Sequence, residues 1–176
     1  RYANDANCLA LSEATDGAGA GADVVFAAIL GTGTGAGISV QRQVLTGPHR
    51  LAGEWGHNPL PWPDEDDTPP PPCYCGREGC VEAYVSGPAI SRDHERRTGR
   101  FITARQIADD ARRGDAAAQA TLERHARRLA RALAGIINLL DPDVVVLGGG
   151  LSLMPHLYER VPQLWTDWVF RAGARD

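Results

Sequence analysis

Short apolar runs alternate with glycine-rich, proline-rich and charged connections along the chain. Apolar residues continue without interruption over 24–30 and over 144–147, and such runs predict buried strands. Residues 38–41 alternate apolar and polar side chains, which predicts a further strand with one exposed face. Residues 60–72 are rich in proline and acidic residues and are expected to form an irregular surface loop.

Helices are predicted where a polar cap precedes apolar positions at helical spacing. The four expected helices cover 6–14 after Asn4-Asp5, the residues from Thr103 to about Arg113, the residues from Asp115 to Leu140, and a segment beginning near Pro155. A strand pair, loops, helices, a strand and a last helix, in that order, predict an α/β domain.

Composition narrows the functional classes. The 176 residues include 43% hydrophobic residues, enough for one sizeable core, and the formal net charge of −4 makes nucleic acid an unlikely partner. All 18 basic residues are arginines, so a Walker-type phosphate loop and a lysine Schiff base are excluded. No apolar run is long enough to span a membrane and no secretory pattern opens the chain, so we expect a cytoplasmic protein.

A glycine cluster over 31–37 follows the first predicted strand. Gly31, Gly33 and Ala36 satisfy a loose dinucleotide-binding fingerprint, but a strand follows them where that fingerprint requires a helix, so we reject it. A glycine-rich turn between strands can still present backbone N–H groups to phosphate oxygens, with hydroxyls from Thr32 and Thr34. The alternative is a plain β-hairpin.

One histidine and three cysteines form a candidate metal site. His57, Cys73, Cys75 and Cys80 offer the number and type of ligands that tetrahedral Zn²⁺ requires. A closed site of this kind is structural and defines a zinc-binding loop over 57–80; the alternative is a set of reduced thiols without metal. Cys8 lies far from the cluster in the sequence and is expected to be a small core residue.

Taken together, these motifs resemble the ROK family (repressors, open reading frames and sugar kinases). The resemblance spans nearly the whole chain, and the GEWGH and CxCGxxGCxE motifs are its most specific part. The matching stretches are Ala3-Asn4-Asp5-Ala6-Asn7, Gly53-Glu54-Trp55-Gly56-His57, the run from Cys73 to Glu82, and Val146-Leu147-Gly148-Gly149-Gly150. Within the family, Gly53 to Trp62 looks most like the fructokinase (mannofructokinase) branch.

The resemblance implies an actin-like, ribonuclease-H-like sugar kinase fold of two lobes, with Mg²⁺ entering together with ATP. The activity it implies is ATP-dependent phosphorylation of a hexose at the 6-hydroxyl, with fructose expected first and mannose or glucose as possibilities. The roles it implies are general base for Asp5; hexose binding for Asn4, Glu54, His57 and Glu82; a β/γ-phosphate loop for Gly31, Thr32, Gly33, Thr34 and Gly35; and adenosine contact for Gly148 and Gly149.

Each of these roles has a plainer alternative. Asn4 or Asp5 can simply cap a helix, and Glu54 and Glu82 can be solvated surface charges. His57 is expected to bind zinc through one ring nitrogen and to face the sugar through the other. The rival function is a sugar-sensing repressor of the same family, which needs neither a base nor phosphate-binding glycines. A nucleic-acid-binding zinc ribbon fits neither the acidic charge nor the single Cys₃His set.

The Asp-Gly-Gly-Thr-like segment with which family members open has no match in this sequence. We therefore expect residues 1–176 to be the C-terminal lobe of a two-lobe kinase, without the N-terminal phosphate segment and the extreme C-terminus. The isolated chain is expected to turn over ATP poorly or not at all, and a homodimer is expected to cover its exposed apolar surface.

Overall fold

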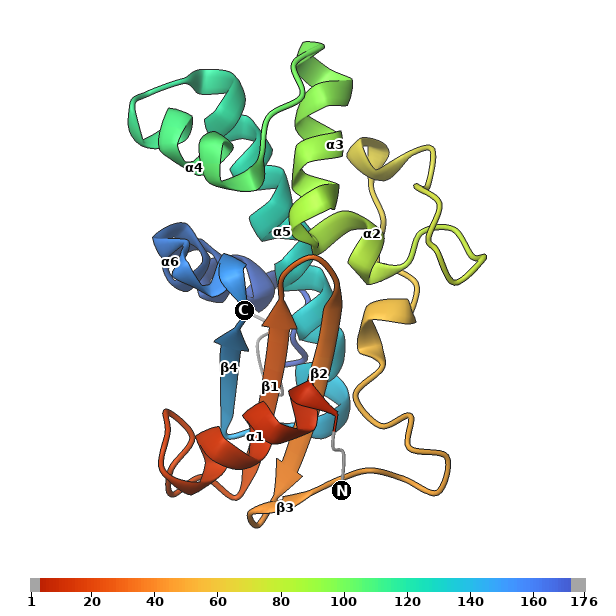
Figure 1. Ribbon diagram of the computed structural model, residues 1–176, viewed down its shortest axis with the longest axis vertical. Helices are drawn as coiled ribbons and strands as arrows, with labels where there is room; N and C mark the ends of the chain where they lie inside the picture. Colours follow the sequence, from red (N-terminus) through yellow and green to blue (C-terminus); the bar gives the residue numbers. More distant parts are fainter. Residues whose placement is uncertain (1–3, 172–176) are drawn as a thin grey trace.

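The computed structural model describes residues 4–171 as a four-stranded sheet with a helix on each face and a helical layer beyond one end of the strands (Figure 1). The strands are β1 Val24–Leu30, β2 Thr34–Val40, β3 Gln43–Val44 and β4 Val144–Gly148, in the order β3-β2-β1-β4. The α-helices are α1 Asp5–Thr15, α2 Val81–Val85, α3 Gly87–Thr98, α4 Ala104–Arg112, α5 Ala116–Leu140 and α6 Pro155–Leu164. Short 3₁₀ helices cover Trp55–His57, Glu65–Asp67, Gly150–Leu153 and Trp165–Asp167.

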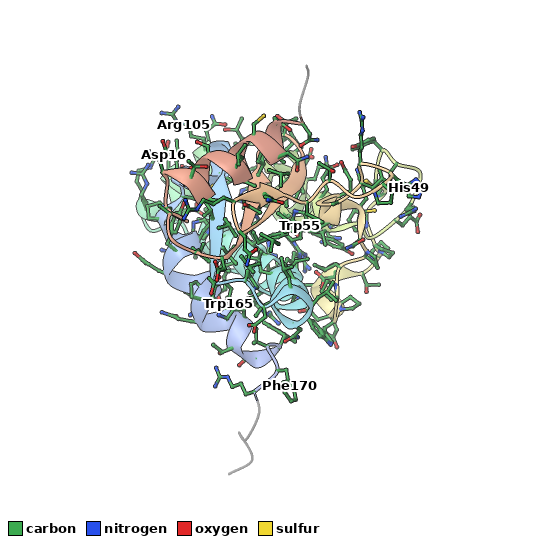
Figure 2. All side chains as sticks on the ribbon, turned by 90° about the horizontal axis from the view of Figure 1, so that it is seen from below. Asp16, His49, Trp55, Arg105, Trp165 and Phe170 are labelled. Atoms are coloured by element: carbon green, nitrogen blue, oxygen red, sulfur yellow. The ribbon has the colours of Figure 1, made fainter. Side chains whose placement is uncertain are left out.

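Strand β1 lies at the centre of the sheet and sends alternate side chains to its two faces. Val25 and Ala27 pack with the buried alanines of α1, whereas Phe26 and Leu30 belong to the larger core that includes α5. Figure 2, seen from below, shows α1 on one side of the strands and α5 on the other, with Trp55 in the interior. The ring of Trp55 meets Phe26 edge to face, with the ring centroids 5.5 Å apart.

The direction of the strands decides where a ligand can bind. β1 pairs antiparallel with β2 and parallel with β4, in a register that aligns Val25 with Val144 and Ile29 with Gly148. The carboxyl ends of β1 and β4 therefore lie at the same edge of the sheet, and α/β proteins bind their ligands at this edge. The turn after β1 and the glycines after β4 both lie there.

The glycine cluster differs from the sequence prediction. Strand β2 begins at Thr34 and not at residue 38, so only residues 31–33 form the turn. Gly37 lies within the strand, and it is a glycine because α1 crosses the strand closely here: a Cβ at this position would lie 2.2 Å from the carbonyl oxygen of Ala6. The absence of a side chain therefore serves helix packing here.

The helix predictions from residue 103 onward are confirmed. Thr103 and Gln106 form a capping box at the start of α4, and the Asp115 carboxylate accepts a hydrogen bond from the N–H of Ala118 at the start of α5. Helix α6 begins at Pro155, as expected. Between residues 4 and 171, no helix is both long enough and apolar enough to cross a bilayer.

Three sequence predictions need correction. The sequence pattern predicts neither α2, which is only five residues long, nor α3, whose charged residues mask the short buried stripe that faces α5. The segment 60–72 is irregular but is not merely a surface loop, since Leu60 and Asp67 are buried. Cys8 is exposed and is not a core residue. Ala3 of the first matched motif lies outside the described residues.

Candidate functional site

A cavity of about 380 Å³ opens where the turn after β1 faces the start of α1. Asn4 and Asp5 line it from α1, residues 31–36 from the turn and β2, and Glu54 from the segment that crosses β2. Its volume lies in the range of small-molecule sites, roughly 300–1,000 Å³. The structure therefore brings the expected base Asp5, the two expected sugar ligands Asn4 and Glu54, and the expected phosphate turn to a single cavity.

The start of α1 places two polar side chains in this cavity. The Asn4 side-chain oxygen caps the helix and accepts hydrogen bonds from the N–H groups of Ala6 at 2.9 Å and Asn7 at 3.3 Å. The amide group of Asn4 remains able to donate to a ligand. Asp5 is exposed, and its Oδ1 accepts a hydrogen bond from the N–H of Ala6 at 2.8 Å. Capping therefore falls mainly to Asn4, and Asp5 keeps its other carboxylate oxygen for a ligand.

The segment that carries Glu54 lies flat against β2 because two glycines permit the contact. A Cβ at Gly53 would lie 1.9 Å from the carbonyl oxygen of Ala36, and a Cβ at Gly56 would lie 2.0 Å from that of Thr34. Gly53 also has φ = +94°, which only glycine adopts readily. The GEWGH motif thus supplies the Glu54 side chain to the cavity, and its two glycines allow its backbone to lie in close contact with the sheet.

Glu82 reaches the glycine turn from α2 and lines a neighbouring cavity together with Thr32, Cys73 and Tyr74. Its Oε2 accepts a hydrogen bond of 2.7 Å from the backbone N–H of Thr34. This bond ties α2 to the first residue of β2 and holds the carboxylate beside the glycine turn. Glu82 is therefore not a solvated surface charge.

The four expected metal ligands lie together. Their donor atoms are all within 4.8 Å of one another, with 3.6 Å between His57 Nδ1 and Cys73 Sγ and 3.6 Å between the Sγ atoms of Cys75 and Cys80. A tetrahedral Zn²⁺ with its usual bond lengths separates two sulfur ligands by about 3.8 Å and a nitrogen and a sulfur by about 3.6 Å. The donor set and its spacing fit zinc, and Nδ1 is the histidine nitrogen that would bind it.

The thiols in this cluster differ in acidity. Burial raises the pKa of Cys80 to about 12, with further contributions from Cys75 and Cys73. The pKa of Cys75 is lowered, chiefly by a hydrogen bond from the backbone of Arg77. A bound cation has to displace the protons of such thiols, so metal binding at this cluster depends on pH.

The other nitrogen of His57 does not face open space. Its Nε2 lies 3.0 Å from the hydroxyl of Tyr74, and the two rings meet edge to face with centroids 5.1 Å apart. With zinc on Nδ1, the neutral imidazole would carry its proton on Nε2, so Nε2 would donate to the Tyr74 hydroxyl oxygen. The negative charge of Glu82 is the main factor that raises the pKa of Tyr74. Sequence reasoning missed Tyr74, although its place between two cysteine ligands was a signal that it lies beside the imidazole.

The glycines after β4 do not line the cavity that holds Asp5, and packing explains why both lack a side chain. A Cβ at Gly148 would lie 2.5 Å from Leu9 Cδ2 of α1, and one at Gly149 would lie 2.5 Å from the carbonyl oxygen of Leu30. They share the edge of the sheet with the glycine turn, as the parallel pairing requires. Their contact with adenosine stays a prediction from the family resemblance.

Comparison with protein families identifies the chain. The ROK family model matches residues 1–175, which is nearly the whole sequence. The chain belongs to the ROK family. The N-acetyl-D-glucosamine kinase of Yersinia enterocolitica is 38% identical over 177 aligned residues, covering 98% of this chain.

Solved ROK structures share this fold. A ROK family glucokinase from Streptomyces griseus in complex with glucose and AMPPNP superposes with a TM-score of 0.84 at 30% identity, covering 98% of this chain and 59% of that one. A ROK family transcriptional regulator homologous to the Escherichia coli MLC protein superposes with a TM-score of 0.80 at 29% identity, covering 96% of this chain and 44% of that one. The expected ROK sugar kinase fold is therefore confirmed, and it is one that kinases and regulators share.

This ROK chain spans 58% of the length of the Yersinia relative. That relative is an N-acetyl-D-glucosamine kinase, so the likeness to the fructokinase branch that Gly53 to Trp62 suggested is not supported. The sequence of the GEWGHNPLPW run points to the family but does not separate one hexose from another, because specificity depends on the arrangement of the whole site.

Proposed function

We propose that the complete protein transfers the γ-phosphoryl group of ATP to the 6-hydroxyl of N-acetyl-D-glucosamine. The observation that carries this proposal is the single cavity shared by Asp5, Glu54 and residues 31–36. The 38% identity to an N-acetyl-D-glucosamine kinase supports this sugar over fructose. Glucose and mannose differ from it at carbon 2 and are the nearest competitors.

In this proposal Asp5 accepts the proton of the 6-hydroxyl as its oxygen attacks the γ-phosphorus of ATP. The bond between the γ-phosphorus and the bridging oxygen breaks, and ADP leaves. Phosphoryl transfer requires mainly positioning and charge neutralisation, and a carboxylate within reach of the hydroxyl can accept a late proton. The N–H groups of the turn at residues 31–33 would hold the β- and γ-phosphates, and Mg²⁺ would enter with the nucleotide.

The proposed sugar-binding side chains are Asn4, Glu54, His57 and Glu82. For His57, a sugar hydroxyl would take the place of the Tyr74 hydroxyl at Nε2. Carboxylates accept hydrogen bonds from adjacent hydroxyls, and the amide of Asn4 donates. Zinc held by His57, Cys73, Cys75 and Cys80 would be structural, because four protein ligands leave no open position for substrate. The ion would fix the ring of His57 and the hairpin that leads to Glu82, in which Pro72 pairs with Glu78.

A hexose panel tests the proposal. The complete protein is assayed with ATP and N-acetyl-D-glucosamine, N-acetyl-D-mannosamine, glucose, mannose or fructose, and kcat/KM is compared. We expect N-acetyl-D-glucosamine to have the highest value. A higher value for fructose would return the assignment to fructokinase, and a higher value for glucose would make the protein a glucokinase.

The second candidate is a sugar-sensing regulator, favoured by the similarity to the solved ROK regulator. A sensor needs sugar ligands but neither a base nor a phosphate turn, and this chain has both Asp5 and the glycine turn. Absence of phosphorylation with every sugar, together with sugar-dependent binding of the complete protein to operator DNA, would favour the regulator. A homodimer stays a prediction, tested by the mass of the complete protein in solution.

A further inference from the structure

The connection between His57 and Glu82 contains little regular structure, yet both of its ends belong to the site. Close to the site it is fixed by backbone pairing: the N–H of Leu60 donates to the Gly79 carbonyl at 2.8 Å, and that of Val81 donates to Asn58 at 2.9 Å. Far from the site it carries the acidic run Asp64-Glu65-Asp66-Asp67, which ends in a buried carboxylate. The proposed function makes no use of this run.

The Asp67 carboxylate is enclosed by two arginines of α5, Arg128 and Arg131, which together form what we call the socket. The side chain of Asp67 is fully buried; Oδ1 accepts from Arg128 Nε at 2.8 Å and Oδ2 accepts from Arg131 Nη2 at 2.7 Å. The N–H of Asp64 also donates to Oδ2, at 2.9 Å. Burial alone would raise the pKa of Asp67, but these hydrogen bonds and the two positive charges outweigh burial and lower it. The carboxylate is therefore charged and paired inside the fold.

Arg128 extends the socket to two further elements. Its Nη1 donates to the Asp93 carboxylate on α3 at 3.0 Å, and its Nη2 donates to the Asp66 carbonyl at 2.8 Å. Its guanidinium also lies over the ring of Tyr84, 5.3 Å from the ring centroid. One side chain of α5 thus contacts α3, the acidic run and α2.

Tyr84 links the socket to the site. Its hydroxyl donates to the backbone carbonyl of Asp67 at 2.9 Å, so α2 is bound to the acidic run through the hydroxyl and to Arg128 of α5 through the ring. Helix α2 is only five residues long, and Glu82 lies on it two residues before Tyr84. An interaction that holds Tyr84 in place therefore also holds the Glu82 carboxylate, which accepts a hydrogen bond from the N–H of Thr34.

We propose that Asp67 is a positioning residue for sugar binding, which acts through Arg128 and Tyr84 to hold Glu82 against the glycine turn. The proposal rests on the proposed function for the role of Glu82 as a sugar ligand. A helix of five residues has too few internal hydrogen bonds to keep one orientation by itself, so its orientation is set by side chains that bind it to its surroundings. Asp67 and Arg128 provide that binding from outside the cavity that holds Asp5.

The test compares Asp67→Asn with Glu65→Gln in the complete protein. Glu65 is exposed and lies in the same 3₁₀ helix, so its substitution makes the same chemical change outside the socket. We expect Asp67→Asn to raise the KM for N-acetyl-D-glucosamine about tenfold or more, because small displacements of positioning groups are costly, while the KM for ATP changes less than about twofold. Glu65→Gln is expected to leave both unchanged. A wild-type sugar KM in folded Asp67→Asn protein would overturn the proposal.

A second variant covers the case in which Asp67→Asn does not fold. Tyr84→Phe keeps the ring under Arg128 and removes only the hydroxyl that donates to the Asp67 carbonyl. It is expected to raise the sugar KM severalfold without changing the KM for ATP. An unchanged sugar KM in Tyr84→Phe would also overturn the proposal.

Hydrogen exchange separates this proposal from the kinase assignment. The Thr34 amide is protected by its bond to Glu82, so Tyr84→Phe should accelerate exchange at Thr34 relative to the Ala28 amide in the centre of the sheet. This readout needs no activity. If the complete protein phosphorylates no sugar but Thr34 responds, only the proposed function fails; if Thr34 exchanges at the wild-type rate, the positioning role fails.

Discussion

Glu82 accepts a hydrogen bond from the backbone N–H of Thr34 across 48 positions of sequence, and this 2.7 Å contact joins the expected sugar side of the site to the expected phosphate side. The same carboxylate lies so close to the turn that a Cβ at Gly33 would approach Glu82 Oε2 to 2.8 Å. Residue 33 must therefore be glycine if Glu82 is to keep this position.

We expect Gly33→Ala to raise the KM for sugar while changing the melting temperature little. The new methyl group meets the end of a flexible side chain, which can swing away at small cost in folding free energy but then leaves its hydrogen bond. Gly150→Ala is the control, since a Cβ there meets nothing within 4 Å and Gly150 does not line the cavity, so its sugar KM should match the wild type. Equal sugar KM values for the two variants would contradict the prediction.

Replacing Asp5 by Asn should lower kcat of the complete protein by about 10²–10⁴-fold, the usual contribution of a general base. Sugar affinity, measured by calorimetry without ATP, should change much less, because Asn still forms hydrogen bonds. Asp16→Asn at the other end of α1 is the control, since Asp16 is exposed and does not line the cavity. If Asp5→Asn retained the wild-type kcat, Asp5 would be only a helix residue.

Metal analysis of the purified protein is expected to find one zinc ion per chain. Cys75→Ser should lower that content and raise the sugar KM, because the metal would fix the imidazole of His57 and the hairpin before Glu82. Cys8→Ser, at an exposed thiol outside the cluster, should change neither. Zinc-free wild-type protein with normal sugar affinity would rule out a structural metal.

We expect the buried side chain of His125 to lower the free energy of unfolding in mild acid. Burial lowers its pKa to about 4, while its Nε2 lies 2.9 Å from the Val85 carbonyl and donates to it. The unfolded chain binds a proton near the ordinary pKa of 6.5 and the folded chain does not, so this group destabilises the fold progressively as pH falls from about 6.5 towards 4. The expected loss between pH 7 and pH 5 is about 2 kcal/mol of unfolding free energy.

Urea denaturation at the two pH values measures this effect, and His125→Gln should reduce the difference. His156 lies beside His125, and burial lowers its pKa too, so part of the slope should remain. His49→Gln, at an exposed position, should keep the full pH dependence. Asp67 and Asp93 also have lowered pKa values, but they titrate below this window. Equal slopes for His125→Gln and the wild type would contradict the prediction.

Local patterns predicted much of the architecture. The apolar runs at 24–30 and 144–147, the Thr103 and Asp115 caps and the Pro155 start all correspond to observed elements. Each of these features depends on residues that are close in sequence. The same patterns failed at Gly37, a glycine inside a strand that makes room for α1, and at Cys8, which lies on the exposed side of α1.

By itself, the sequence determined the family, the α/β class and the types of residue at the site, because motif spacing, caps and ligand chemistry are local properties. Only the tertiary structure decided that Tyr74 faces the imidazole of His57, that Glu82 binds the N–H of Thr34, and that Asp67 is buried between Arg128 and Arg131. Asp67 and Arg128 are 61 positions apart, and no sequence feature next to either residue predicts that they contact each other. A charge becomes a buried, paired charge only when folding excludes water around it, and that depends on how distant segments pack.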